Sequence, residues 1–415
     1  MRRLTTEREA HVLELAGRLA DRFAGRAGEH DRDNTFPAEN WPELAAAGYL
    51  GLAVPAELGG FDADAGELLL AQERLAQGCG ATALAVDMHL TTASSLRSLW
   101  RAGAAPRAEA LLRGAATGEV VLASCTSEAG FGGALEDCAT TATRVEGGFR
   151  LTGRKIFFTE SDVATHFTTC ARHEHPALGP QMLFFNGVSI DTPGLVVHRT
   201  WDTLGMRATQ SNDLELADAF VPEEALFHAY PVGHLDGGIG LSVMSLNVPS
   251  FGAIALGIAT AGMEWVREAV LGRGRQGDPE VQHSFARMEV LLESARATLY
   301  RHGQELARFD RAAELTVEEV YARGNLAKYV ACENAIAIMD LVMEIAGGQG
   351  YHRRFPVERL YRDVRAGAIM PYSSPDARKL FAEVSLDLSS RPVFGYQEGA
   401  EQVRRVLAPA GAAAA

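Results

Sequence analysis

The chain has 415 residues, of which 47% are hydrophobic, so it is long enough for two or three domains with sizeable cores. Its formal net charge of −14 argues against a nucleic-acid or anionic-membrane partner. Five scattered cysteines form no CxxC pair, so no disulfide framework or metal site is expected, and a reduced cytoplasmic location fits best. No long apolar leader follows Met1 and no uninterrupted apolar run reaches the length of a membrane span, so neither a signal peptide nor a membrane segment is predicted.

Residues 1–118 are predicted to be helical. Thr6 to Phe23 is rich in Ala, Leu, Glu and Arg, with apolar residues at helical spacing. A second helix is expected to open at Phe36-Pro37, because proline suits the first turn of a helix. Helical sequence resumes from Gly66 to Gln77 and again from Ala81 to Trp100. In the last of these, three residues are spaced to share one face: Leu84, Met88 and Ser95.

Residues 119–228 have a different character and predict a middle β domain. The turn at Gly147-Gly148 leads into Phe149 to Gly153, which is typical of a strand leaving a tight turn. Lys155 to Thr159 and Met182 to Phe185 are short runs rich in strand-forming residues.

From residue 229 to 390 the spacing is helical again. One apolar stripe consists of Phe285, Met288, Leu292, Ala295 and Leu299. Ala327 to Ile345 contains no Gly or Pro and is mostly apolar, as helices buried in a bundle are. Residues 391–415 are expected to form a tail, frayed from Ala408 onward. The predicted fold class is therefore α+β, mainly α: helices, then a β domain, then a helical bundle.

Over residues 30–390 the chain resembles the acyl-CoA dehydrogenases, a family of FAD-dependent α-helical enzymes. The resemblance begins at Phe36 to Trp41, continues in Ala47 to Pro55, and is most specific in Gly347-Gly348-Gln349-Gly350-Tyr351 followed by Pro356-Val357-Glu358 and Arg362-Asp363. It implies an N-terminal helical domain, a central β domain and a C-terminal four-helix bundle. A homodimer or homotetramer is also implied, since the family's cofactor site is shared between chains.

The same resemblance assigns residues to a flavin. The loop Thr126-Ser127-Glu128 is similar to the family loop that hydrogen-bonds the flavin pyrimidine edge. Donors there stabilise the negative charge that arises on reduction. By the match to a family strand, Phe157 would stack against the ring system and Thr159 would donate to flavin N5 or O4.

A second set of residues corresponds to the family's contacts with the FAD of a neighbouring subunit. These are Arg273, Gln282, Gly347, Gly348 and Gly350. Glycines let a backbone approach a pyrophosphate without a Cβ clash. The chain departs from the family in carrying Gln276 in place of Phe and Glu344 in place of Gln, so FMN instead of FAD stays open.

The family's usual base is missing from the sequence. Counting from Arg362-Asp363 places Pro371 where many relatives carry the Glu that removes the substrate's α-proton, and proline cannot accept a proton. A second position used by some relatives falls within Ser245 to Phe251, which has no carboxylate. His89 and Asp376 are the candidate replacements.

Three hypotheses therefore stay open. The chain desaturates an acyl thioester of CoA or a carrier protein with an unidentified base, passing electrons to an electron-transfer flavoprotein. Alternatively it belongs with the monooxygenases and N-hydroxylases of the superfamily, which take reduced flavin from a partner reductase, act on amines, phenols or sulfur heterocycles, and need no α-proton base. The third hypothesis is a catalytically silent flavoprotein.

Overall fold

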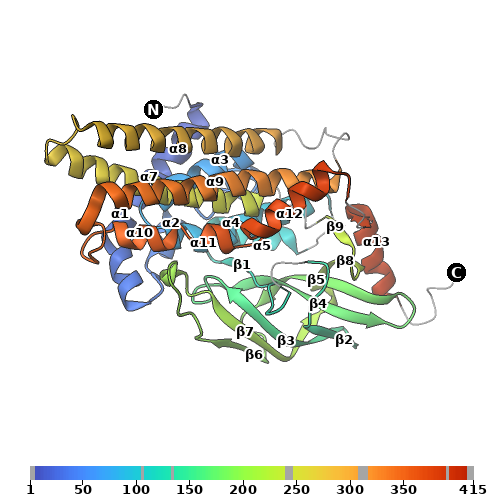
Figure 1. Cartoon of the computed structure of the whole chain (residues 1–415). Helices are drawn as coiled ribbons and strands as arrows, with labels where there is room; N and C mark the ends of the chain where they lie inside the picture. The colour runs from blue at the N-terminus through green and yellow to red at the C-terminus, as the bar shows by residue number, and fades with distance from the viewer. Residues whose placement is uncertain are drawn as a thin grey trace.

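The structure, a computed structural model, describes residues 5–103, 107–131, 135–238, 246–306, 316–388 and 392–408. The long helices lie on one side of the molecule and the large sheet on the other (Figure 1). The N-terminal helices are α1 (Glu7–Asp33), α2 (Asn40–Ala46), α3 (Ala65–Ala76), α4 (Gly80–Arg101) and α5 (Ala108–Thr117). No helix in the described part of the chain has both the length and the apolar character needed to cross a membrane.

The starts of α1 and α3 are fixed by local sequence. Thr6 and Glu9 form a capping box at the start of α1, and Asp64 and Glu67 form one at the start of α3. Each box satisfies backbone N–H groups that have no partner within the helix. Asn34 ends α1 in the left-handed conformation that asparagine tolerates.

The middle domain is one large, mostly antiparallel sheet with the strand order β6-β7-β3-β2-β4-β5-β8, and β1 pairs with β4 in parallel. Its core is formed by alternate residues that face inward, among them Phe149, Phe158 and Phe185. The strands are β1 (Leu122–Ser124), β2 (Thr141–Val145), β3 (Gly148–Phe158), β4 (His166–His175), β5 (Gly179–Ser189), β6 (Leu195–His198), β7 (Asn212–Pro222) and β8 (Leu226–Pro231).

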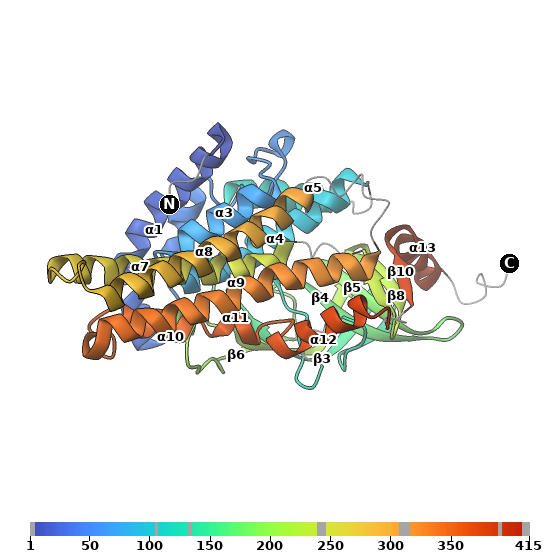
Figure 2. The same ribbon diagram turned by 45° about the horizontal axis from the view of Figure 1, so that its top comes forward.

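The C-terminal helices form a bundle in which α9 packs against α7, α8 and α12. Figure 2 shows the three longest of them running side by side. The helices are α7 (Val248–Gly272), α8 (Pro279–Leu306), α9 (Val317–Ala346), α10 (Val357–Asp363), α11 (Ala366–Ile369) and α12 (Ser374–Ser385). The stripe predicted in α8 is confirmed, because Met288, Leu292, Ala295 and Leu299 are buried and Phe285 packs against the same core. The predicted fold class is also confirmed.

Gly257 lies where α7 packs closely against α3. A Cβ at this position would lie 2.2 Å from the carbonyl oxygen of Glu73 and 2.7 Å from the Cβ of Ala76. Gly257→Ala is therefore expected to lower the free energy of unfolding by about 1–3 kcal/mol or more, because two backbones must separate. Gly272→Ala, at the end of the same helix with nothing within 4 Å of the new Cβ, is the control and should change stability by less than about 1 kcal/mol. Urea unfolding of both variants checks this, and equal effects would contradict it.

The predicted tail from residue 391 is wrong for much of its length. Strand β10 (Val393–Gly395) pairs in parallel with β9 (Leu235–Gly237), and helix α13 (Tyr396–Leu407) follows it onto the sheet (Figure 1). Val406 is buried in the core of the β domain. Gln402 donates to the side chain of Gln181 on β5 at 2.7 Å. Residues 409–415 lie outside the described residues.

Candidate active site

A cavity of about 620 Å³ lies where all three domains meet. One wall comes from α4, a second from β1, β3 and the loops around residues 126 and 201–211, and a third from the start of α7 and residues 362–376. Much of the lining is apolar, with hydroxyl and amide groups interspersed. The apolar lining residues include Leu84, Met88, Leu96, Leu99, Phe184, Phe227 and Phe251.

Four residues that the sequence assigned to a flavin line this cavity together: Thr126, Ser127, Phe157 and Thr159. Phe157 has a φ of 60° and is 52% exposed, whereas its neighbour Phe158, which ends the same strand, is buried. Trp201 lines the cavity beside it, with the two rings edge to face at 6.0 Å. An exposed aromatic face next to several hydroxyls is a surface on which a flat, hydrogen-bonding ring system can lie.

Thr159 is connected to two further hydroxyls. Its Oγ1 lies 2.8 Å from Oγ of Ser211, which lies 2.8 Å from Oγ1 of Thr209. Thr209 Oγ1 donates in turn to the carbonyl oxygen of Met206 at 2.9 Å. Ser211 was missed as a site residue, although the run from Trp201 to Thr209 beside it resembles the family.

The loop at residues 126–128 is fixed from inside the β domain by a buried ion pair. Lys155 Nζ lies 2.6 Å from Glu128 Oε1, and both side chains are almost completely buried. Lys155 also donates to the carbonyl oxygen of Thr126 at 3.4 Å. Glu128 accepts further bonds from the Ala139 and Thr140 backbone N–H groups and from the Thr140 hydroxyl. This fully bonded pair places Thr126 and Ser127 at the cavity wall.

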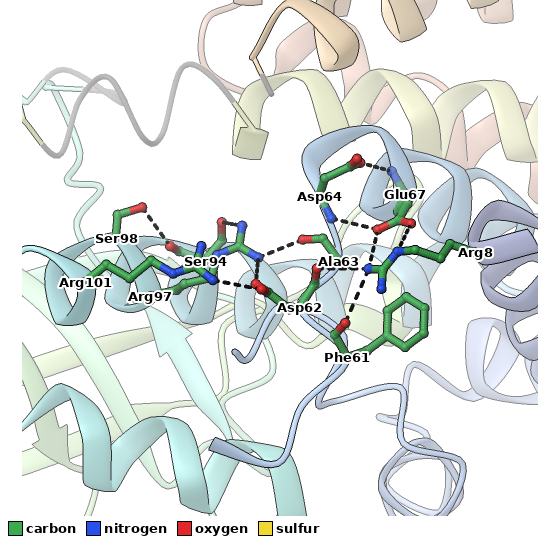
Figure 3. Close-up of polar contacts among 10 residues, drawn as sticks. All are labelled: Arg8, Phe61, Asp62, Ala63, Asp64, Glu67, Ser94, Arg97, Ser98 and Arg101. Atoms are coloured by element: carbon green, nitrogen blue, oxygen red, sulfur yellow. Dashed lines mark hydrogen bonds and ion pairs between the residues drawn. The ribbon is translucent and has the colours of Figure 1, made fainter. Parts of the chain in front are cut away.

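The wall formed by α4 is fixed by charges on its outer side (Figure 3). Arg97 and Arg101 both pair with the carboxylate of Asp62, and Arg97 also donates to the carbonyl oxygen of Ala63 at 2.7 Å. Arg8 of α1 donates to the Asp62 carbonyl oxygen and pairs with Glu67. The face of α4 turned to the cavity carries Thr91, Thr92, Ser95, Ser98 and Leu99.

The third wall contains Pro371, and its backbone is held on both sides. Lys328 of α9 donates from Nζ to the carbonyl oxygens of Met370 and Tyr372. Lys328 is buried, and burial lowers the pKa of its ammonium group. Pro371 therefore contributes a rigid wall of the cavity and no ionisable group.

Comparisons with known proteins identify the family. The descriptions "Acyl-CoA dehydrogenase, N-terminal domain", "middle domain" and "C-terminal domain" match residues 5–119, 123–219 and 250–372. The chain belongs to the acyl-CoA dehydrogenase family. Its members among the relatives are flavin-dependent oxidoreductases or monooxygenases, and the chain is an enzyme of this superfamily.

Relatives from two branches are about equally similar. An L-evernosamine nitrososynthase of Micromonospora sp. is 32% identical over 384 residues, which covers 88% of this chain and 87% of that protein. The putative acyl-CoA dehydrogenase YdbM of Bacillus subtilis is 31% identical over 380 residues, covering 89% and 94%. The structure of KijD3 in complex with FMN and dTDP-3-amino-2,3,6-trideoxy-4-keto-3-methyl-D-glucose has a TM-score of 0.84 at 27% identity, covering 93% of this chain and 96% of that one.

In this member of the family, His89 is not placed to act as a base. It does not line the cavity, and both ring nitrogens are engaged by backbone groups. Nε2 lies 3.0 Å from the carbonyl oxygen of Leu50, and Nδ1 accepts from the N–H of Leu122 at 3.0 Å. Burial lowers the pKa of His89 to about 4, so the imidazole is neutral with its proton on Nε2. The hypothesis that His89 is the base is therefore not supported by its position.

Asp376 does line the cavity, and it is the sole carboxylate among the lining residues that the structure describes. It lies in the first turn of α12, is exposed, and accepts a hydrogen bond from the hydroxyl of Ser373, the N-cap residue. This is a capping contact, and it leaves Asp376 at the solvent-facing part of the lining. The segment at the family's alternative base position contributes Asn247, Val248 and Phe251 to the lining, with Ser245 outside the described residues.

The residues expected to reach a neighbour's FAD do not line this cavity. Arg273 and Gln282 lie at the α7–α8 turn, and Gly347, Gly348 and Gly350 follow the end of α9, all at one end of the bundle (Figure 1). Gly347 has a φ of 57°, and a Cβ on Gly347 or Gly348 would point into open space. A contact between these residues and a second subunit's cofactor stays a prediction, as does the homodimer or homotetramer.

Proposed function

We propose that this enzyme is a reduced-flavin-dependent monooxygenase that oxidises the nitrogen atom of a small amine. The observation that carries the proposal is that the lining residues described by the structure include no buried carboxylate: Pro371, which by counting in the sequence falls where many relatives carry the base, lines the cavity, and Asp376 is an exposed capping residue. Desaturation of an acyl thioester needs a carboxylate of raised pKa against the α-carbon. Oxygen transfer to nitrogen does not. The similarity to nitrososynthases over most of the chain supports the proposal.

Thr126, Ser127, Phe157 and Thr159 would hold the isoalloxazine ring, which FMN and FAD share. When bound in its reduced form, the flavin supplies the two electrons with which O₂ is divided between the substrate nitrogen and a molecule of water. The chain's own residues exclude solvent through the apolar lining and fix the ring through hydroxyl groups. A flavin reductase is the partner that this reaction requires.

A second candidate function is α,β-desaturation with Asp376 as the base, favoured by the presence of that carboxylate in the lining. Electrons would then pass to an electron-transfer flavoprotein. The two candidates differ in what they require. Desaturation consumes oxidised flavin and leaves an enoyl thioester, whereas N-oxygenation consumes reduced flavin and O₂ and adds 16 Da to the substrate.

In the experiment, the purified full chain is given the reactants of each candidate reaction in turn. We expect no flavin bleaching when the oxidised, flavin-loaded protein meets a panel of acyl-CoA thioesters without air. With reduced flavin, O₂ and a panel of amines that includes dTDP-amino sugars, we expect a product heavier by 16 Da in mass spectrometry. Asp376→Asn should keep at least about a tenth of this N-oxygenation rate, because no proton-accepting step depends on it. Ser373→Ala, which removes the capping hydroxyl, is the matched control.

Bleaching by an acyl-CoA that disappears in Asp376→Asn but survives in Ser373→Ala would instead establish desaturation. Loss of a general base typically costs about 10²–10⁴-fold in rate, so the two outcomes are well separated.

A further inference from the structure

The hydroxyl groups of Thr159, Ser211 and Thr209 form a buried series of hydrogen bonds. Thr159 is 7% exposed, Ser211 3% and Thr209 0%, and Thr209 does not line the cavity, so the hydrogen of Thr209 must be donated inside the protein. Among the described residues, two backbone acceptors end the series. Met206 offers its carbonyl oxygen to Thr209 at 2.9 Å, and Phe157 offers its carbonyl oxygen to Thr159 at 3.4 Å. The first distance is typical of a good hydrogen bond and the second is at the limit of one.

These distances decide the direction of the hydrogens, because each hydroxyl has one to donate. If Thr209 donates to Met206, Ser211 must donate to Thr209, and Thr159 must donate to Ser211. The acceptor at the end of the series is itself fixed: the Met206 carbonyl also accepts from Trp201 Nε1 at 3.0 Å, and the Met206 N–H donates to the buried carboxylate of Asp363 at 2.6 Å. Thr159 is then left with a lone pair, and no hydrogen, for the cavity.

We propose that Thr209 and Ser211 are positioning residues that hold Thr159 as a hydrogen-bond acceptor, so that the site favours reduced over oxidised flavin. The inference rests on the proposed flavin site and on the resemblance that puts Thr159 beside flavin N5 or O4, but it makes Thr159 an acceptor there instead of the donor that the resemblance implies. Nitrogen N5 carries a hydrogen in reduced flavin and can donate it to Thr159. In oxidised flavin N5 is an acceptor, and Thr159 then offers it no hydrogen. A site with this preference suits an enzyme that receives its flavin already reduced.

Thr209→Val tests the direction of the series. It keeps the volume of the buried side chain but removes the hydroxyl that accepts from Ser211 and donates to the carbonyl oxygen of Met206. The hydrogen of Ser211 then has no acceptor at position 209 and can be donated to Thr159 instead, which leaves the hydrogen of Thr159 free to point into the cavity, where it suits oxidised N5. We expect the ratio of the dissociation constants of oxidised and reduced FMN to fall about tenfold, the value of one hydrogen bond gained or lost. For a two-electron couple this lowers the potential of bound FMN by about 30 mV.

The ratio is measured by anaerobic titration of the full chain with oxidised and with dithionite-reduced FMN. Wild type should bind the reduced form more tightly, Thr209→Ser should keep the wild-type ratio, and Ser211→Ala should lie between wild type and Thr209→Val. Ser161→Ala is the matched control. Its hydroxyl is nearby, donates to the Gln210 carbonyl oxygen at 3.2 Å and does not line the cavity, so the ratio should not change.

Two results would overturn the proposal in distinguishable ways. In the first, FMN binds with the same ratio of dissociation constants in wild type, Thr209→Val and Ser211→Ala. In that case the hydroxyls of Thr209 and Ser211 do not set the preference for reduced flavin, and only the proposed role of these two residues is wrong. If FMN binds in neither redox state, both the proposed flavin site and the proposed role of Thr209 and Ser211 are wrong.

Discussion

Lys155→Met is expected to lower the free energy of unfolding by about 3–5 kcal/mol, because it leaves the Glu128 carboxylate buried without a counter-charge. The Lys155 side chain is 0% exposed and that of Glu128 3%, so water cannot replace the lost ammonium group. The loop that carries Thr126 and Ser127 should lose its support as well, and binding of flavin should weaken with it. Urea unfolding followed by circular dichroism measures the first effect, and FMN titration the second.

Two further variants separate the buried charge from a general effect of removing lysine. Lys379→Met removes an exposed lysine whose Nζ lies 3.8 Å from Glu383, and it should change stability by less than about 0.5 kcal/mol. Adding Glu128→Gln to Lys155→Met should restore part of the loss, since the uncompensated charge is then gone. Equal losses in the single and double variants would show that the ion pair is not the cause.

Asp87→Asn is expected to flatten the dependence of stability on pH. Asp87 is buried in α4, and burial raises its pKa from 3.8 to about 7. A carboxyl group with a raised pKa in the folded state contributes stability that is complete below about pH 4 and is lost as the pH rises through about 7. At about 1.4 kcal/mol for each pH unit, the loss is about 4 kcal/mol.

The asparagine fits the existing hydrogen bonds. Its oxygen can accept from Gln72 Nε2, now 2.9 Å from Asp87 Oδ1, and its amide can donate to Ser250 Oγ, now 2.6 Å from Oδ2. Ser250 keeps its own acceptor, the Asn247 carbonyl oxygen. The variant should therefore lie within about 1 kcal/mol of wild type near pH 4.5 and exceed it by up to about 4 kcal/mol near pH 8.

Urea unfolding at several pH values tests this, with the exposed Asp191→Asn as control. Part of the decline with pH should remain in Asp87→Asn, because burial also raises the pKa of Glu160 well above its ordinary value. If stability declines with pH as steeply in Asp87→Asn as in wild type, Asp87 is not the group responsible for the decline.

Short motifs in the sequence singled out four residues that the structure brings to one cavity. Thr126 and Ser127 lie in one loop and Phe157 and Thr159 at one strand end, so a short motif suffices to bring each pair to the cavity. The hydrogen-bonded series of Thr159, Ser211 and Thr209 could not be predicted in this way. Ser211 meets Thr159 across 52 residues of chain, and only the packing of the turn at residues 206–211 against β3 determines which hydroxyl lies beside which.

His89 shows how a single helix position separates a site residue from a structural one. Leu84, Met88 and Ser95 were predicted to share a face, and all three line the cavity. His89 follows Met88 directly, and one residue is a rotation of about 100° around a helix. Its ring therefore points away from the cavity toward Leu50 and Leu122. The same spacing argument, applied to Val403, Val406 and Leu407, would have predicted the packed helix in place of a tail.

The position of Trp201 gives the molecule an optical reporter of its own. The chain has four tryptophans, and Trp201 is the one that lines the cavity, edge to face with Phe157. A flavin stacked on Phe157 would lie close enough to quench the emission of this indole directly, while Trp41, Trp100 and Trp265 report on the helical domains. Fluorescence of the unlabelled protein can therefore follow the filling and emptying of the cavity in real time, and Trp201→Phe should silence that signal.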